Sequence, residues 1–135
     1  MSLSRVNVSL IFSSSIPSID LLKLGILAKN GKNISVTEAD SLTYTAALLK
    51  YNSNDCVNAI NRFTNYLNQF PTGSYALEAN FFISECFLNN KDWTNALVGY
   101  TYVNNKGYSR YFEKATAEAA QINYFELKNY KLISP

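Results

Sequence analysis

The amino-acid sequence predicts an all-α fold built from repeated pairs of helices. Similar residues recur at intervals of 37 positions through the latter part of the chain. No strand-like alternation of apolar and polar residues persists after residue 38, and turns rich in Asn and Lys separate amphipathic stretches of helical length. The chain has 135 residues, of which 47% are apolar, so it is long enough for one folded domain and too apolar for disorder.

Residues 1–36 are predicted to form a helical cap or a divergent preceding repeat. Apolar residues between positions 19 and 27 indicate a short helix. Gly31 follows it and is a suitable stop, because glycine readily adopts the left-handed backbone found after a helix. Thr37 and Asp40 then have the spacing of a capping box, so we expect a new helix to begin there.

The following residues are predicted to hold two full helix–turn–helix repeats and a partial third, over residues 37–135, with bounds near 38–73, 74–110 and 111–135. Asp55, Asp92 and Asn129 occupy equivalent positions in the 37-residue interval. Ala59 and Ala96 match in the same way, four residues after Asp55 and Asp92. Small residues at such positions allow two helices to cross closely. One irregular bundle with accidental periodicity is disfavoured, because several independent positions agree in register.

The end of the first repeat has a clear signal. Pro71 follows Phe70 and stops the second helix, because proline has no N–H to continue the hydrogen-bond ladder. Residues 72–74 (TGS) then supply a turn and a cap for the next helix. A single helical hairpin cannot bury its apolar face alone, so stacking of neighbouring hairpins is expected to supply the core.

The composition argues against catalysis and cofactor binding. The sequence contains no His, the commonest general base and metal ligand, and its two Cys do not make a zinc site without it. No glycine-rich phosphate loop or nucleophile–base pair occurs. Carboxylates such as Glu113 and Glu118 lie on a repetitive surface helix. We therefore expect a non-enzymatic protein without a metal or a cofactor.

Charge and hydropathy argue against nucleic-acid binding and membrane insertion. Twelve basic and 10 acidic residues give a formal charge of +2. So small an excess does not supply the clustered positive surface that a nucleic-acid-binding protein needs. Basic and aromatic residues alternate between Lys106 and Lys114, but a solvated loop explains this pattern better than a nucleic-acid surface. The apolar run at residues 6–12 is far shorter than the roughly 20 residues that span a bilayer.

Three stretches carry the motif of a known family: residues 92–97 (DWTNAL), 55–60 (DCVNAI) and 63–71 (FTNYLNQFP). Through them the repeats resemble the tetratricopeptide repeat (TPR), a helix–turn–helix unit of about 34 residues. The extended linker between repeats is similar to that of the subgroup related to the Tol–Pal coordinating protein. Cys56 departs from the pattern, since an aromatic residue is usual there.

A narrower resemblance covers residues 35–130. It rests on residues 38–44 (EADSLTY), 69–73 (QFPTG) and 119–124 (AAQINY), which are similar to the C-terminal region of large TPR proteins from Bacteroidetes. The resemblance favours a periplasmic or cell-envelope location, with the cytoplasm as the alternative. Because the third repeat ends soon after Tyr130, we expect adjacent repeats in a longer parent chain.

The resemblance implies a right-handed α-solenoid whose first helices line a concave groove for a peptide or a partner protein segment. The groove positions carried over from the family are Tyr44, Leu48, Asn52, Phe81, Glu85, Asn89, Glu118, Ile122 and Glu126. Tyr44 and Phe81 would be aromatic anchors. The acidic residues would favour a neutral or basic partner, and Tyr44 and Leu48 exclude the clamp that binds a terminal carboxylate.

A second interpretation is an architectural spacer within a longer solenoid. Such a spacer would bury Tyr44, Phe81 and Ile122 against neighbouring repeats and would bind no ligand of its own. A binding module would instead present an exposed apolar groove. Both interpretations follow from the same repeats, and a binding scaffold is the preferred prediction.

Overall fold

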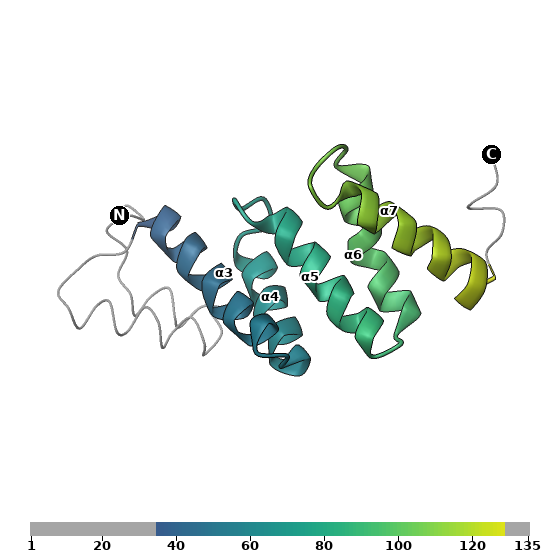
Figure 1. The fold of residues 1–135 in the computed structure, drawn as a ribbon. Helices are drawn as coiled ribbons and strands as arrows, with labels where there is room; N and C mark the ends of the chain where they lie inside the picture. The colour runs from purple at the N-terminus through teal and green to yellow at the C-terminus, as the bar shows by residue number, and fades with distance from the viewer. Residues whose placement is uncertain (1–34, 129–135) are drawn as a thin grey trace. The chain divides into compact units, whose positions relative to one another are not determined.

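Every regular element in the described part of the chain, residues 35–128 of the computed structural model, is helical (Figure 1). The elements are α3 (Val36–Asn52), α4 (Cys56–Gln69), α5 (Ala76–Asn89), α6 (Trp93–Asn105), α7 (Phe112–Gln121) and the π-helix η2 (Ile122–Glu126). The all-α prediction is confirmed for these residues. None of these helices is both long and apolar enough to cross a membrane. The helix expected between positions 19 and 27, and the end of the third repeat beyond residue 128, lie outside the described residues.

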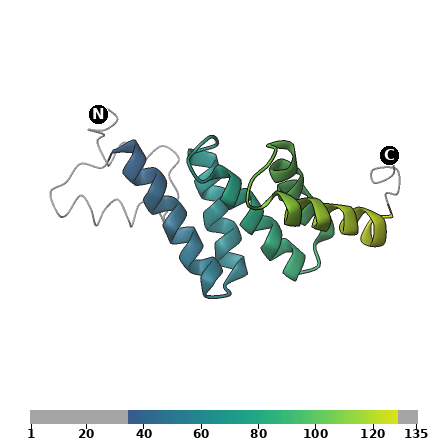
Figure 2. The same cartoon turned by 45° about the horizontal axis from the view of Figure 1, so that its top comes forward.

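The chain divides into two compact units, Met1–Ala76 and Leu77–Pro135. The described part of the first unit holds α3, α4 and the loop that leads to α5. The second unit holds nearly all of α5, together with α6, α7 and η2. Within each unit the α-helices reverse direction at a turn or a short loop, as Figures 1 and 2 show, whereas η2 continues directly from α7.

Helix α3 begins earlier than the sequence pattern predicts. The Ser35 hydroxyl accepts the Glu38 backbone N–H at 3.0 Å, and the Glu38 carboxylate accepts the Ser35 N–H at 3.1 Å. This pair is the capping box, so the predicted box of Thr37 and Asp40 is wrong. The physical reason is that the Asp40 carboxylate is buried and accepts hydrogen bonds from elsewhere in the first unit.

The turns after α3, α5 and η2 share an unusual backbone conformation at equivalent positions. Asn54, Lys91 and Lys128 follow one another at intervals of 37 residues. Their φ angles are 62°, 59° and 59°, in the left-handed region that few residues other than glycine adopt. The recurrence in sequence therefore corresponds to a recurrence in local structure.

The helices that follow the first two of these turns are capped identically. Asp55 accepts the Asn58 backbone N–H at 3.2 Å and its side-chain amide at 2.8 Å. Asp92 accepts the same two groups of Asn95 at 3.3 and 2.8 Å. In each helix the bond from the backbone N–H satisfies a donor that the first turn leaves free, and the bond from the side-chain amide adds a second link to the cap. The hydrogen bonds from Asn58 hold the pKa of the Asp55 carboxyl below its ordinary value.

In the first unit, the Tyr66 hydroxyl joins α3, α4 and the loop that follows. It donates to the buried Asp40 carboxylate at 2.5 Å and accepts the Tyr75 N–H at 2.9 Å. The other Asp40 oxygen accepts the Ser74 N–H at 3.0 Å. Gly73 leaves room for this network, because a Cβ at that position would lie 2.5 Å from the Tyr66 hydroxyl oxygen.

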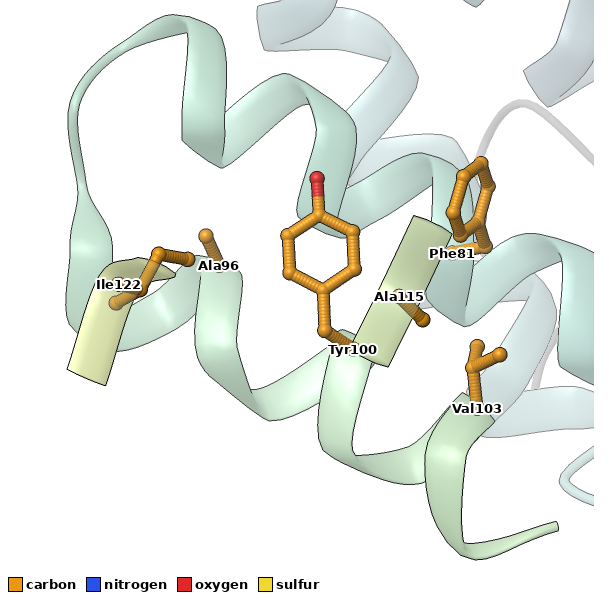
Figure 3. Close-up of a cluster of buried hydrophobic side chains, with 6 residues drawn as sticks. All are labelled: Phe81, Ala96, Tyr100, Val103, Ala115 and Ile122. Atoms are coloured by element: carbon orange, nitrogen blue, oxygen red, sulfur yellow. The ribbon is translucent and has the colours of Figure 1, made fainter. Parts of the chain in front are cut away.

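In the second unit, six buried side chains from α5, α6, α7 and η2 form the core (Figure 3): Phe81, Ala96, Tyr100, Val103, Ala115 and Ile122. Ala96 is fully buried. Helices α5 and α6 also approach closely at Gly99, where a Cβ would collide with the Asn80 carbonyl and the Ser84 hydroxyl. That hydroxyl donates to the Ala96 carbonyl at 2.6 Å, which ties the two helices together.

The loop between α6 and α7 is held against the same core by Tyr111. Its ring lies 4.6 Å from that of Phe81, measured between centroids. Burial raises the pKa of the Tyr111 hydroxyl above its ordinary value of 10.0, and the charge of Glu78 adds to this effect. The Asn104 side-chain amide also donates to the Thr116 hydroxyl at 2.5 Å, a direct link from α6 to α7.

Candidate functional site

A pocket of about 240 Å³ lies in the second unit, between the α5–α6 turn and the stretch formed by the end of α7 and η2. It is lined by Leu88, Trp93, Glu118, Gln121, Ile122, Phe125 and Glu126. Leu88 lies in the last turn of α5, and Trp93 is the first residue of α6. The other lining residues belong to α7 and η2.

The lining combines apolar surface with negative charge. Leu88, Trp93, Ile122 and Phe125 supply two aliphatic and two aromatic side chains. The ionisable groups among the lining residues are both carboxylates, those of Glu118 and Glu126. Within residues 35–128, neither carboxylate forms a hydrogen bond or an ion pair. Both therefore remain available to a positively charged group from outside.

The π-helix η2 shapes one side of this pocket. The Leu127 N–H donates to the Ile122 carbonyl, five residues back, at 2.8 Å. At the equivalent positions in the first two turns, Ser53 and Asn90 donate to carbonyls four residues back, at 3.1 and 3.3 Å. One extra residue thus enters the turn. Phe125, within this widened turn, lines the pocket while remaining 59% exposed.

Tyr44 and Phe81, the predicted aromatic anchors, are buried, with exposed fractions of 8% and 5%. The Tyr44 ring stacks on Tyr75, with centroids 4.3 Å apart. The Phe81 ring lies against Tyr111 and Tyr100, at 4.6 and 5.9 Å. Contact with a ligand at either ring would require these neighbours to move.

Glu85, another predicted groove residue, is already paired inside the second unit. One carboxylate oxygen accepts the Tyr100 hydroxyl at 2.7 Å, and the other accepts the Lys114 ammonium at 2.8 Å. Its side chain is only 12% exposed. Among the remaining predicted residues, Leu48 is half-buried, and Asn52 and Asn89 are the exposed last residues of α3 and α5.

Three of the nine predicted residues come together in the pocket: Glu118, Ile122 and Glu126. The sequence prediction missed the other four lining residues. Gln121 and Phe125 are four positions apart on the same helical stretch, so helical spacing could have found them. Leu88 and Trp93 reach the pocket through a tertiary contact, which spacing along the chain does not reveal.

The fold and the pocket define an all-helical protein with a mixed apolar and acidic surface pocket. In the part of the chain described, no three His, Cys, Asp or Glu side chains lie close enough to hold a metal ion together. Comparisons of the chain with protein-family models, with curated proteins and with solved structures find no match.

Proposed function

We propose that this chain is a non-enzymatic protein–protein interaction scaffold of the TPR type, which binds a peptide or partner segment in the pocket of its second unit. One observation carries the proposal. Glu118, Ile122 and Glu126, selected as groove positions from the sequence, line one pocket. In this proposal the chain binds a protein segment and catalyses no reaction.

The repeat assignment is supported by local geometry that recurs every 37 residues. The left-handed turn residues and the Asp caps recur at this interval, with nearly equal hydrogen-bond lengths. Ala59 and Ala96 are both fully buried, as are Phe63 and Tyr100 at the next matched position. Stacked helix–turn–helix units of this kind would form a right-handed α-solenoid, the architecture that we propose for the chain.

The pocket has the character of a recognition site. Apolar walls with a few polar groups are typical of binding pockets, because the walls supply affinity and the polar groups fix orientation. Its volume of about 240 Å³ is below the roughly 300–1,000 Å³ of small-molecule sites. A pocket of this size favours a side chain presented by a larger partner.

The second candidate function is that of an architectural spacer in a longer solenoid. The burial of Tyr44, Phe81 and Ile122 favours it, since a spacer has no need of exposed anchors. Tyr44 stacks on Tyr75 and Phe81 packs against Tyr111, each within its own unit. Their burial is therefore also compatible with a binding site placed elsewhere, in the pocket.

Affinity purification from a lysate of the source organism separates the two functions. The wild-type chain would be compared with Phe125→Ala, in the pocket, and with Val98→Ala, an exposed residue of α6 outside it. A partner retained by the wild type and Val98→Ala but lost by Phe125→Ala is the expected result. If all three chains are folded by circular dichroism and none retains a partner, the spacer function is favoured.

A further inference from the structure

The two free carboxylates of the pocket come from one continuous helical stretch, α7 followed by η2. Glu118, Ile122 and Glu126 follow one another at intervals of four residues, and all three line the pocket. Glu118 lies in α7 and Glu126 in η2, eight positions further along the same continuous stretch. Ile122, midway between them in the sequence, is 1% exposed and belongs to the core beneath the pocket.

The lining residues from the α5–α6 side of the pocket are apolar and aromatic. Leu88 and Trp93 line that side, and Phe125 adds a second aromatic ring from η2. Aromatic faces attract cations, and the indole of Trp does so most strongly. No Lys or Arg is among the lining residues. The pocket therefore offers several favourable contacts to a cation with an apolar stem.

Glu85, in the same unit, shows how a carboxylate can be neutralised from within the chain. Glu85 is neutralised by Lys114, at 2.8 Å. Glu118 and Glu126 have no such partner among the described residues. A neutral ligand in the pocket would remove water from two charges without replacing it, which costs free energy. A cationic ligand would replace that water with a charge-assisted hydrogen bond.

We propose that the pocket selects an arginine or lysine side chain, next to an apolar residue, in an extended basic segment of a partner protein. The cation pairs with Glu118 or Glu126, and its aliphatic stem covers Leu88 and Trp93. Arginine binds more tightly than lysine, because its planar guanidinium can pair with a carboxylate bidentately and stack on Trp93. This inference rests on the proposed function and names the chemistry of the partner.

The experiment begins with a random octapeptide library displayed on phage and selected against the whole chain. Enriched sequences are then synthesised and titrated into the chain. Trp93 is the single Trp of the sequence and lines the pocket, so its fluorescence reports binding at this site. We expect the enriched peptides to carry Arg or Lys beside an apolar residue, and their affinity to fall with added salt.

Charge variants test the two carboxylates directly. Glu118→Gln combined with Glu126→Gln is expected to weaken binding about tenfold or more, as for loss of a hydrogen bond to a charged group. Glu113→Gln is the matched control, because Glu113 is an exposed carboxylate of α7 outside the pocket. It should bind like the wild type. Circular dichroism would confirm that each variant remains helical.

A change in the peptide completes the cycle. Replacing its arginine with citrulline, a neutral group of similar shape, should weaken binding to the wild type about as much as the double variant does. The double variant should barely distinguish the two peptides, because the interaction energy belongs to the pair of partners.

The possible failures of the inference and of the proposed function can be told apart. Neutral or acidic peptides that bind in the pocket, or basic peptides that bind the double variant as tightly as the wild type, would overturn the inference and leave the scaffold function intact. Selection of no peptide above background would overturn both and favour the spacer. Self-association in sedimentation velocity that disappears in the double variant would instead identify a second copy of the chain as the occupant.

Discussion

The Tyr66 hydroxyl is the clearest case of one atom holding several segments of the first unit in place. It bonds to Asp40 in α3 and to Tyr75 in the loop after α4. The sequence motif that contains Tyr66 was recognised from its resemblance to the TPR, but the hydrogen bonds of its hydroxyl were not predicted. Asp40 lies 26 residues away, and its spacing from Thr37 suggested a cap instead.

Tyr66→Phe is expected to lower the free energy of unfolding by about 1–3 kcal/mol, because it leaves a buried carboxylate and an N–H with one partner fewer. Urea denaturation followed by circular dichroism measures this change. Tyr108→Phe is the control, since Tyr108 is 89% exposed, and it should change stability by less than about 0.5 kcal/mol. Equal stability of the two variants would contradict the proposed role of the hydroxyl.

At the scale of elements, the N-cap of α4 gives the chain a predictable pH dependence. The folded-state pKa of Asp55 lies below its ordinary value of 3.8, so the folded state binds fewer protons than the unfolded state near that pH. Its stabilising effect is complete above 3.8 and is lost as the pH falls through the folded pKa.

Asp55→Asn keeps a good cap but removes the charge. The melting temperature of the wild type should exceed that of Asp55→Asn at neutral pH, and the two should converge in strong acid. Thermal melts across this pH range measure the difference. Val98→Ala adds no titrating group, so its difference from the wild type should be independent of pH. If the difference in melting temperature between the wild type and Asp55→Asn grew in acid, the expected direction of the pH dependence would be contradicted.

The crossing of α5 and α6 depends on Gly99. Gly99→Ala should cost about 1–3 kcal/mol, because the new Cβ would overlap the Asn80 carbonyl and the Ser84 hydroxyl. Val98→Ala, one residue away on an exposed position, should cost much less. Urea unfolding of both variants tests the contact, and similar stabilities would show that the helices can separate at no cost.

Local signals in the sequence predicted the elements well where a short stretch decides the structure. Pro71 follows the end of α4, and the Asn- and Lys-rich turns fall where α3 and α5 end. The π-helix at residues 122–126 was not predicted, because its apolar pattern also fits an ordinary α-helix. The predicted start of α3 was wrong, because two residues fit the pattern of a capping box. Ser35 and Thr37 are each followed three positions later by an acidic residue, and the structure uses Ser35.

At the scale of the whole molecule, the all-α class followed from periodicity, whereas the site depended on packing between helices. The family resemblance supplied nine groove positions, and three of them line the pocket. Glu85 illustrates why position alone is insufficient. Its carboxylate would be a good ligand for a cation, but Tyr100 and Lys114 occupy both of its oxygens. These two partners lie 15 and 29 positions away from Glu85 in the sequence, so local spacing does not reveal them.

The claim that this chain binds a partner through the pocket is tested most directly by mapping amide chemical shifts in an isotopically labelled chain during titration with the tightest selected octapeptide. The largest shifts are expected at residues 88–93 and 118–126, with α3 and α4 nearly unchanged. Saturable shifts centred on α3 or α4, with none at residues 118–126, would contradict the claim and move the binding site to the other unit.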